Sequence, residues 1–172
     1  MKNRLDALEV ALTNEMREHE FYLKNAERTH NPAGKAMFQQ IAAEELEHYQ
    51  RLKQLSENWS KNQKWPETVP LNVKETNVST ILKDMVKKAS RIPKGDADDL
   101  KAIQTAVDFE ANGALFYARL RDDCTDPKEK AFFNLLADIE HEHYVSLKDA
   151  EELMTDPVSW YRNRESAGLD GA

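Results

Sequence analysis

The stretch that decides the fold reads Glu45-Leu46-Glu47-His48, and it recurs 95 residues later as Glu140-His141-Glu142-His143. Each copy is a Glu-x-x-His motif in a segment whose apolar residues follow helical spacing. Positions i and i+3 share one face of a helix, so each motif points its Glu and its His to the same side. A lone Glu-x-x-His in a helix this charged is usually a solvated surface feature.

The two motifs belong to a longer internal repeat, in which residues 11–57 align without a gap on residues 106–152. Each copy has a further Glu thirty residues upstream of its motif, Glu15 in the first and Glu110 in the second. The shared positions outside the motifs include Phe21/Phe116, Tyr22/Tyr117, Pro32/Pro127, Lys35/Lys130 and Phe38/Phe133. A match of this length indicates one supersecondary unit that is used twice.

The composition favours an all-α protein, because 32% of the 172 residues are charged, Gly and Pro are few, and apolar residues recur at helical spacing. We therefore predict one four-helix bundle in residues 1–155. It consists of two repeated hairpins, 3–64 and 96–155, and a crossover, 65–95, that holds an extra shorter helix. Residues 156–172 are expected to form a C-terminal tail with a last helical turn and a loose polar end.

Charge and cysteine content exclude several classes of function. The net charge of −7 argues against nucleic acid as the main partner, and no apolar run is long enough to span a membrane. The N-terminus has no apolar signal region, so a cytoplasmic location is expected. The single cysteine, Cys124, excludes a four-thiolate metal site within one chain and is expected to be a small buried hydrophobe.

Helix geometry places the repeated polar residues at one level of the bundle. Glu15 lies sixteen residues before the turn at Asn31, which is about 24 Å at roughly 1.5 Å per residue. Glu45 and His48 lie about 21–26 Å back along the second helix. The same count holds for the second hairpin, and it gives the predicted metal ligands: Glu15, Glu45, His48, Glu110, Glu140 and His143.

Four buried carboxylates without cations would repel one another and lose hydration, at a cost on the order of several kcal/mol each. Two divalent cations would balance four negative charges and use the neutral imidazoles as ligands. One Glu from each of two helices and Glu-x-x-His from the other two is the pattern of di-iron and di-manganese carboxylate sites. Oxygen and imidazole ligands favour Fe or Mn, and Zn could occupy the site as a substitute.

Three residues near these ligands are candidates for supporting roles. Tyr22 and Tyr117 lie two turns beyond the upstream glutamates, and we interpret them as core residues whose hydroxyls can hydrogen-bond the ligand carboxylates. His19 lies one turn beyond Glu15 and is predicted to be a satisfied core histidine rather than a metal or proton carrier.

The remaining acidic residues near the motifs are expected to face solvent. Glu44, Glu47 and Glu142 lie off the apolar stripes of their helices. Glu18 aligns with Gly113 in the repeat, and solvent exposure is expected for it too, although it could swing in as an extra carboxylate.

With these motifs, the sequence resembles the ferritin-like superfamily, and most of all the rubrerythrin-type di-iron proteins. The resemblance rests on the six predicted ligands, the two Phe-Tyr pairs and the segment Asp156-Pro157-Val158-Ser159-Trp160. It implies two non-haem iron ions and the reduction of hydrogen peroxide or dioxygen at them. Glu45 and Glu140 would bridge the two ions, and Glu15 and Glu110 would be terminal ligands.

The sequence departs from the rubrerythrin pattern in two places. Rubrerythrins carry a rubredoxin module with four cysteines, which the single cysteine cannot supply, so an external electron donor such as a rubredoxin-like protein is expected. They also carry a Glu three residues after the third-helix ligand, and this chain has Gly113 at that position. Glu18, three residues after Glu15 in the first copy, could take the role of that Glu instead. The chain is also similar to bacterioferritin, but Leu46 stands where the haem-binding Met would be, so no haem is expected.

Three functions follow from this interpretation. The first is an oxidoreductase that reduces peroxide or dioxygen at a dinuclear iron centre. The second is a ferritin-like ferroxidase that stores iron in a protein shell, and the third is a metal-free helical interaction protein. A homodimer is expected, and it could exchange hairpins through the crossover.

Overall fold

The computed structural model describes residues 2–62, 64–65, 73–88 and 91–169. Within these ranges the chain forms six helices and no strand, which confirms the all-α prediction. The helices are α1 (Lys2–Arg28), α2 (Pro32–Asn62), α3 (Val78–Lys88), α4 (Ala97–Asp122), α5 (Pro127–Thr155) and α6 (Pro157–Leu169). Parts of the expected crossover and the last residues of the expected tail lie outside the described residues.

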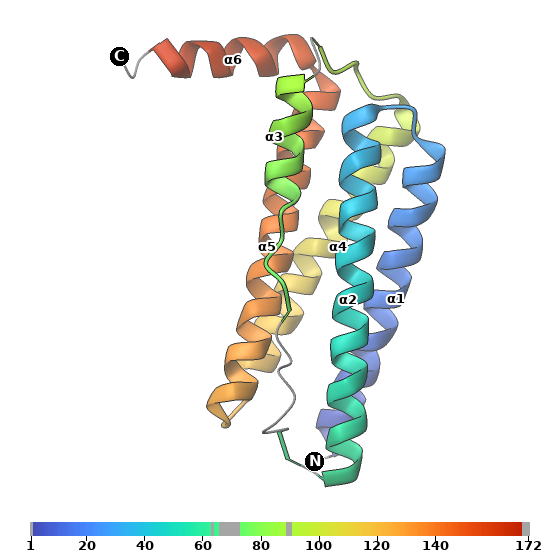
Figure 1. The fold of residues 1–172 in the computed structure, drawn as a ribbon, viewed down its shortest axis with the longest axis vertical. Helices are drawn as coiled ribbons and strands as arrows, with labels where there is room; N and C mark the ends of the chain where they lie inside the picture. The colour runs from blue at the N-terminus through green and yellow to red at the C-terminus, as the bar shows by residue number, and fades with distance from the viewer. Residues whose placement is uncertain (1, 63, 66–72, 89–90, 170–172) are drawn as a thin grey trace.

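Four long helices form the bundle, and Figure 1 shows them running roughly parallel to its long axis. Helix α1 packs along α2 and α4 packs along α5, so each repeat forms an antiparallel hairpin. The shorter helix α3 packs against α2 and α5, between the two hairpins in the chain. The ferritin-like bundle with an extra helix between its hairpins is therefore confirmed.

Side chains with oxygen acceptors begin the helices at the turns where the sequence places them. Asn31 Oδ1 accepts hydrogen bonds from the backbone N–H groups of Ala33 and Gly34, each at 3.1 Å, at the start of α2. Asp96 caps α4 in a reciprocal capping box with Asp99. Asp126 caps α5. These caps satisfy backbone donors that a helix start leaves without partners, and so fix where each helix begins.

The apolar core has two parts, and the polar motifs lie between them along every long helix. The first part includes Tyr22, Phe38, Ile41, Ile103, Leu147 and Leu153. The second includes Leu8, Leu52, Leu55, Tyr117, Phe133 and Leu136. Along α2, for example, Glu45 and His48 fall between Ile41 and Leu52. The bundle therefore encloses a polar layer between two apolar layers.

The helix in the expected tail is longer than the predicted last turn, because residues Pro157–Leu169 form the helix α6. The N–H of Ser159 donates to Asp156 Oδ1 at 3.1 Å, which stabilises the start of this helix. Figure 1 shows α6 leaving the end of the bundle almost at right angles to α5. Asp149 of α5 accepts hydrogen bonds from the Trp160 indole and the Arg164 guanidinium, at 2.9 and 2.7 Å, and so anchors α6.

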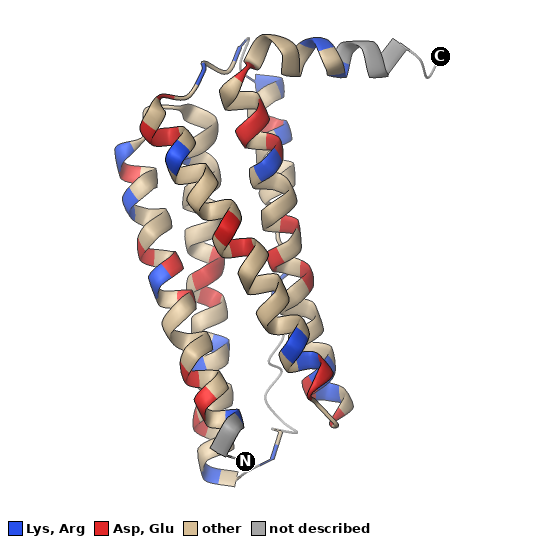
Figure 2. Cartoon of the chain, turned by 180° about the vertical axis from the view of Figure 1, so that it is seen from behind, with Lys and Arg blue, Asp and Glu red and all other residues tan. Residues whose placement is uncertain are grey.

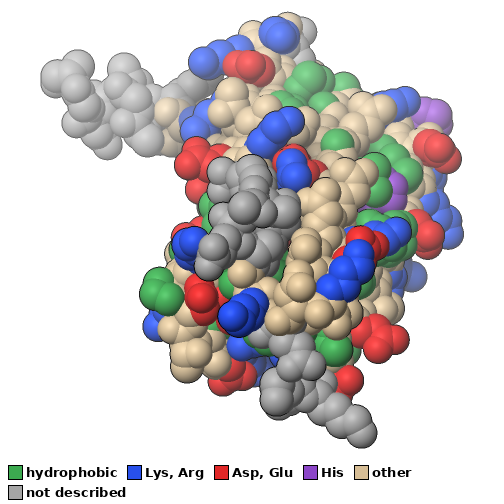
Figure 3. All heavy atoms as spheres, turned by 60° about the horizontal axis from the view of Figure 1, so that its bottom comes forward, with side chains coloured by type: hydrophobic (Ala, Val, Ile, Leu, Met, Phe, Trp, Pro, Cys, Tyr) green, Lys and Arg blue, Asp and Glu red, His purple; other side chains and the backbone are tan. Residues whose placement is uncertain are grey.

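The opposite end of the bundle, near the N-terminus, is a mixed surface. Figure 3 shows basic and acidic side chains of the described residues interspersed with hydrophobic ones on that end. Among the described residues, none of the helices combines the length and the hydropathy needed to cross a membrane.

Candidate metal centre

The bundle brings the six predicted ligands together in its middle, one or two from each long helix. All six are almost fully buried, with exposed fractions of 0 or 1% for Glu15, Glu45, His48, Glu110, Glu140 and His143. Figure 2 shows acidic residues at mid-height of the bundle as well as near its ends. Charged side chains are almost never this buried unless they are paired or coordinate a metal ion.

The ligand atoms fall into two overlapping groups, each compact enough to surround one ion. The first group is Glu15, Glu45, His48 and Glu140, and the second is Glu45, Glu110, Glu140 and His143. Within each group, one nitrogen or oxygen atom of every residue lies within 4.8 Å of the others. Glu45 and Glu140 belong to both groups, which is the arrangement required of two bridging carboxylates.

Both imidazoles direct the same nitrogen toward the carboxylates. His48 Nδ1 lies 3.2 Å from Glu15 Oε2 and 3.1 Å from Glu45 Oε2. His143 Nδ1 lies 3.2 Å from Glu110 Oε2 and 3.3 Å from Glu45 Oε1. The two rings are stacked, with centroids 6.2 Å apart and planes at 19°. The duplicated halves therefore present equivalent nitrogen and oxygen atoms to a shared centre.

Three oxygen atoms at this centre form no hydrogen bond among the described residues, although two of them lie 3.3 and 3.5 Å from a histidine Nδ1. They are Glu45 Oε1 and both carboxylate oxygens of Glu140, all of them buried. Buried acceptors without a partner are unfavourable by about 1–3 kcal/mol or more each. Divalent cations would satisfy them, and oxygen with imidazole is a donor set that suits iron or manganese. The residues present therefore fit a dinuclear metal centre.

Two tyrosines connect the hairpins crosswise at the edges of this centre. The hydroxyl of Tyr22 on α1 donates a hydrogen bond to Glu110 Oε1 on α4. The hydroxyl of Tyr117 on α4 donates to Glu15 Oε1 on α1. Each upstream glutamate thus has one oxygen held by a tyrosine and the other directed at a histidine. These bonds orient the ligand carboxylates, as hydrogen bonds behind a metal ligand commonly do.

Without metal ions, protons bound to the glutamates and histidines offset the negative charge of the buried carboxylates. Burial and the charge of Glu45 raise the pKa of Glu15 to about 8, and burial followed by Glu45 and Glu110 raises the pKa of Glu140 well above its usual value. Burial opposes protonation of both histidines, but the surrounding carboxylates outweigh it and raise the pKa of His48 and of His143.

Glu18 corrects one expectation from the sequence, because its side chain does not face solvent. It is 5% exposed. Burial and the charges of Glu45, Glu110 and Glu15 raise its pKa to about 9. Arg17 forms a longer ion pair with it, at 3.8 Å. Glu18 is therefore a fifth carboxyl group at the polar layer, beside those of Glu15, Glu45, Glu110 and Glu140.

Glu44 corrects a second expectation, because it contacts a predicted ligand. Its Oε2 lies 2.6 Å from His143 Nε2, the ring nitrogen that faces away from the carboxylates. Its side chain is 12% exposed. The sequence does hold a signal for this burial, since the repeat places the apolar Ile139 at the equivalent position. Glu142, by contrast, is exposed as expected.

His19 is a satisfied histidine, as the sequence predicted. Its Nδ1 donates to the backbone oxygen of Ala42 at 2.6 Å, and the ring is partly buried between α1 and α2. Cys124 is buried as predicted, and burial together with Glu129 raises the pKa of its thiol to about 11. Neither residue takes part in the metal centre.

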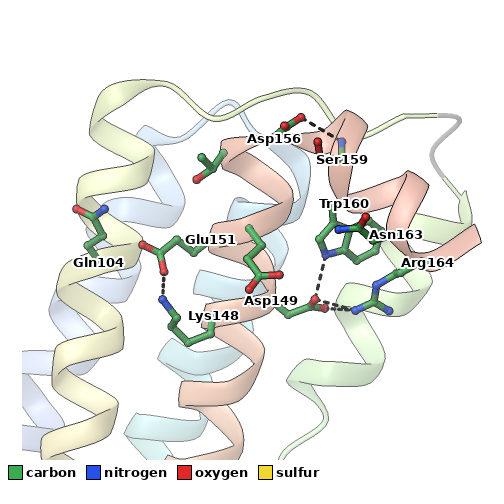
Figure 4. A pocket seen from close by; sticks show the side chains of 11 residues that line it. Gln104, Lys148, Asp149, Glu151, Asp156, Ser159, Trp160, Asn163 and Arg164 are labelled. Carbon is green, nitrogen blue, oxygen red and sulfur yellow. Dashed lines mark hydrogen bonds and ion pairs between the residues drawn. The ribbon is translucent and has the colours of Figure 1, made fainter. Parts of the chain in front are cut away.

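A surface pocket lies elsewhere, between α4, α5 and α6. Figure 4 shows Asp149 accepting from Trp160 and Arg164 on one side of it, with Lys148 paired to Glu151 on the other. The Arg164 guanidinium also lies over the Trp160 ring, 4.1 Å from its centroid. Both basic side chains of the pocket are paired within the chain, Lys148 with Glu151 and Arg164 with Asp149, and the pocket includes none of the six predicted ligands.

Comparison with known proteins agrees with this architecture. The family model named Rubrerythrin matches residues 6–151, which span both hairpins. A search of curated proteins gave no match. A solved structure of a hypothetical protein from Pyrococcus furiosus is similar, with a TM-score of 0.65 and 23% sequence identity over 87% of this chain and 89% of that chain. At this identity the likeness supports the fold alone.

Proposed function

The chain belongs to the rubrerythrin family, and we propose from this that it is a non-haem di-iron oxidoreductase that reduces hydrogen peroxide or dioxygen. The observation that supports the proposal is the pair of overlapping ligand groups with Glu45 and Glu140 in common. Family membership implies iron, and the oxygen and imidazole donors suit it, although manganese or zinc could fill the same positions. Bound ferrous ions would supply the electrons that reduce the oxidant.

The burial of the centre limits what can react there. Its six predicted ligands are at most 1% exposed, and the layers above and below it are packed apolar side chains. A large substrate has no room among these residues, whereas a molecule of two heavy atoms needs little space. This selectivity by size supports peroxide or dioxygen as the oxidant.

The protein residues would hold the centre in one geometry while its charge changes. Tyr22 and Tyr117 fix one oxygen of each upstream glutamate. The shared carboxylates of Glu45 and Glu140 have further oxygen atoms free of hydrogen bonds among the described residues. Glu18 provides a buried carboxyl group that can hold or release a proton beside them.

Electrons to restore the ferrous state would come from a site outside these residues. The 172 residues contain one cysteine, so they cannot hold a four-thiolate iron site of their own. We propose a rubredoxin-like donor in the cytoplasm, and a homodimer as the working form.

The proposal is tested by loading the metal-free protein anaerobically with ferrous iron and then adding peroxide or dioxygen. We expect two ferrous ions per chain, and oxidation of the bound iron by at least one oxidant, followed by optical absorption. Oxidation by neither would contradict the oxidoreductase proposal. Iron uptake that continues far beyond two ions per chain would favour storage instead.

A further inference from the structure

The surroundings of the two metal positions differ, although the six predicted ligands repeat symmetrically. The repeat offset of 95 residues pairs Glu44 with Ile139 and Glu18 with Gly113. In both pairs the carboxylate comes from the first copy, and the second copy has an apolar residue or no side chain. The additional carboxyl groups therefore come from one copy only, so the surroundings of the two metal positions are not equivalent.

Glu44 adds its charge behind one histidine only. If His143 binds a metal ion through Nδ1, its proton is on Nε2, which then donates to Glu44 Oε2 across 2.6 Å. A carboxylate acceptor at this position makes an imidazole a stronger ligand and fixes its orientation. His48 Nε2 is buried and has no hydrogen-bond partner among the described residues. Glu44 of the first copy contacts His143 of the second, and the corresponding position of the second copy, whose symmetry mate would be His48, is the apolar Ile139.

Glu18 places a second additional carboxyl group near Glu45, in agreement with the symmetry of the hairpins. A Cβ at Gly113 would lie 2.7 Å from Glu140 Oε2, so this position of α4 lies directly against a shared carboxylate. The equivalent contact in the other half is between position 18 of α1 and Glu45. The charges of Glu45 and Glu110 act on Glu18 more strongly than that of Glu15. Glu18 is therefore a further buried carboxyl group from the first copy, and the contact that distinguishes the two halves is that of Glu44 with His143.

We propose that the two metal positions are unequal, and that the position between Glu110 and His143 binds its divalent ion first and more tightly. The inference rests on the proposed metal centre. An extra carboxylate near one position attracts a cation to it more strongly in a buried, weakly screened environment. A hydrogen-bonded histidine adds to this, since loss of such a partner typically lowers metal affinity about 10–100-fold.

The test is anaerobic titration of the metal-free full-length chain with Mn²⁺, combined with crystals grown at one equivalent of Mn²⁺. We expect anomalous scattering from manganese mainly beside His143, and the electron paramagnetic resonance signal of isolated Mn²⁺ before that of a coupled pair. Glu44→Gln should weaken the first binding step by about 10-fold. Glu18→Gln should weaken the same step. Glu142→Gln removes an equal charge from an exposed position next to His143 and should change neither step.

Equal occupancy of both positions at one equivalent, or filling of the His48 position first, would overturn the inference while leaving the metal centre intact. The same holds if Glu44→Gln and Glu142→Gln weaken binding equally. Absence of Mn²⁺ and Fe²⁺ binding altogether would overturn both proposals. Thermal unfolding of each metal-free variant shows whether it retains the fold. If Glu44→Gln does not fold, the metal affinity of Glu18→Gln tests the inference in its place.

Discussion

Gly113 is the residue at which the absence of a side chain matters most to the centre. A Cβ there would lie 2.7 Å from Glu140 Oε2, which is closer than real contacts allow. The group in the way is the end of a flexible side chain, so the carboxylate can move at little energetic cost. We predict that Gly113→Ala leaves the stability of the metal-free protein nearly unchanged but weakens metal binding, because Glu140 must leave its position.

Isothermal titration with Mn²⁺ and urea unfolding measure the two effects separately. Gly34→Ala is the matched control, because it adds the same methyl group to a helix. Its Cβ would contact Met154 at 3.4 Å and none of the predicted ligands. Equal metal affinities for Gly113→Ala and the unaltered protein would contradict the role given to this contact.

The six residues that sequence reasoning placed together in the middle of the bundle all have an identical repeat partner. Glu45 and Glu140 support each other's assignment, and so do His48 and His143. Glu18 and Glu44 have no acidic counterpart, and their burial depends on how one hairpin packs against the other. Spacing along a single helix cannot report that packing, because an off-stripe residue of α2 reaches a histidine of α5 only after the bundle has formed.

At the scale of elements, the turn between α1 and α2 does more than start a helix. Asn31 caps α2, and its Nδ2 also donates to the backbone oxygen of Pro93 at 2.8 Å, which connects the turn to the segment before α4. Asp126 has the equivalent place in the repeat and caps α5 through the N–H groups of Lys128 and Glu129. Both turns therefore cap a helix, but only the turn at Asn31 also forms a hydrogen bond to the segment before α4.

We predict that Asp126→Ala lowers the free energy of unfolding by about 1 kcal/mol, the usual loss for an N-cap. Asn31→Ala should lower it further, by an additional ~0.5–1.5 kcal/mol for the hydrogen bond to Pro93. Urea denaturation of the metal-free protein measures both values. A loss at Asn31 no larger than that at Asp126 would show that the contact with Pro93 contributes nothing to stability.

Helix α6 shows how element type can be missed although its start is visible in the sequence. Asp156-Pro157 follows the same pattern as Asp126-Pro127, an acceptor side chain before a proline in the first helical position. The helix was not predicted at full length because residues after Trp160 lack a regular apolar stripe. Its first turns are stabilised instead by the bonds from Trp160 and Arg164 to Asp149, which only the folded chain brings together.

At the scale of the whole molecule, the buried carboxyl groups make stability depend on pH. The pKa is raised to about 8 for Glu15 and to about 9 for Glu18, and it is raised for His48 and His143 as well. At pH values between the ordinary pKa of each group in the unfolded chain and its raised pKa in the folded protein, the folded metal-free protein binds more protons. Its stability therefore decreases as pH rises through this interval. The pKa of Glu45 is lowered by both histidines despite burial, and its contribution is already complete above its ordinary value of 4.5.

We therefore predict that the metal-free protein, kept so by a chelator, unfolds at lower urea concentration at about pH 8.5 than at about pH 5.5. Metal ions replace these protons, so the stabilisation by Mn²⁺ should increase over the same interval. If the stability of the metal-free protein were constant or increased over this pH interval, the raised pKa values of these buried groups would be contradicted.

We propose that six buried side chains from two repeated hairpins hold two metal ions through two shared carboxylates. The most direct test is the number of ferrous ions bound per chain in an anaerobic titration, for the unaltered protein and for the double variant Glu45→Ala, Glu140→Ala. We predict about two ions for the first and loss of both from the second, because each position includes both of these glutamates. Binding of two ions by the double variant, or of none by the unaltered protein, would contradict the account.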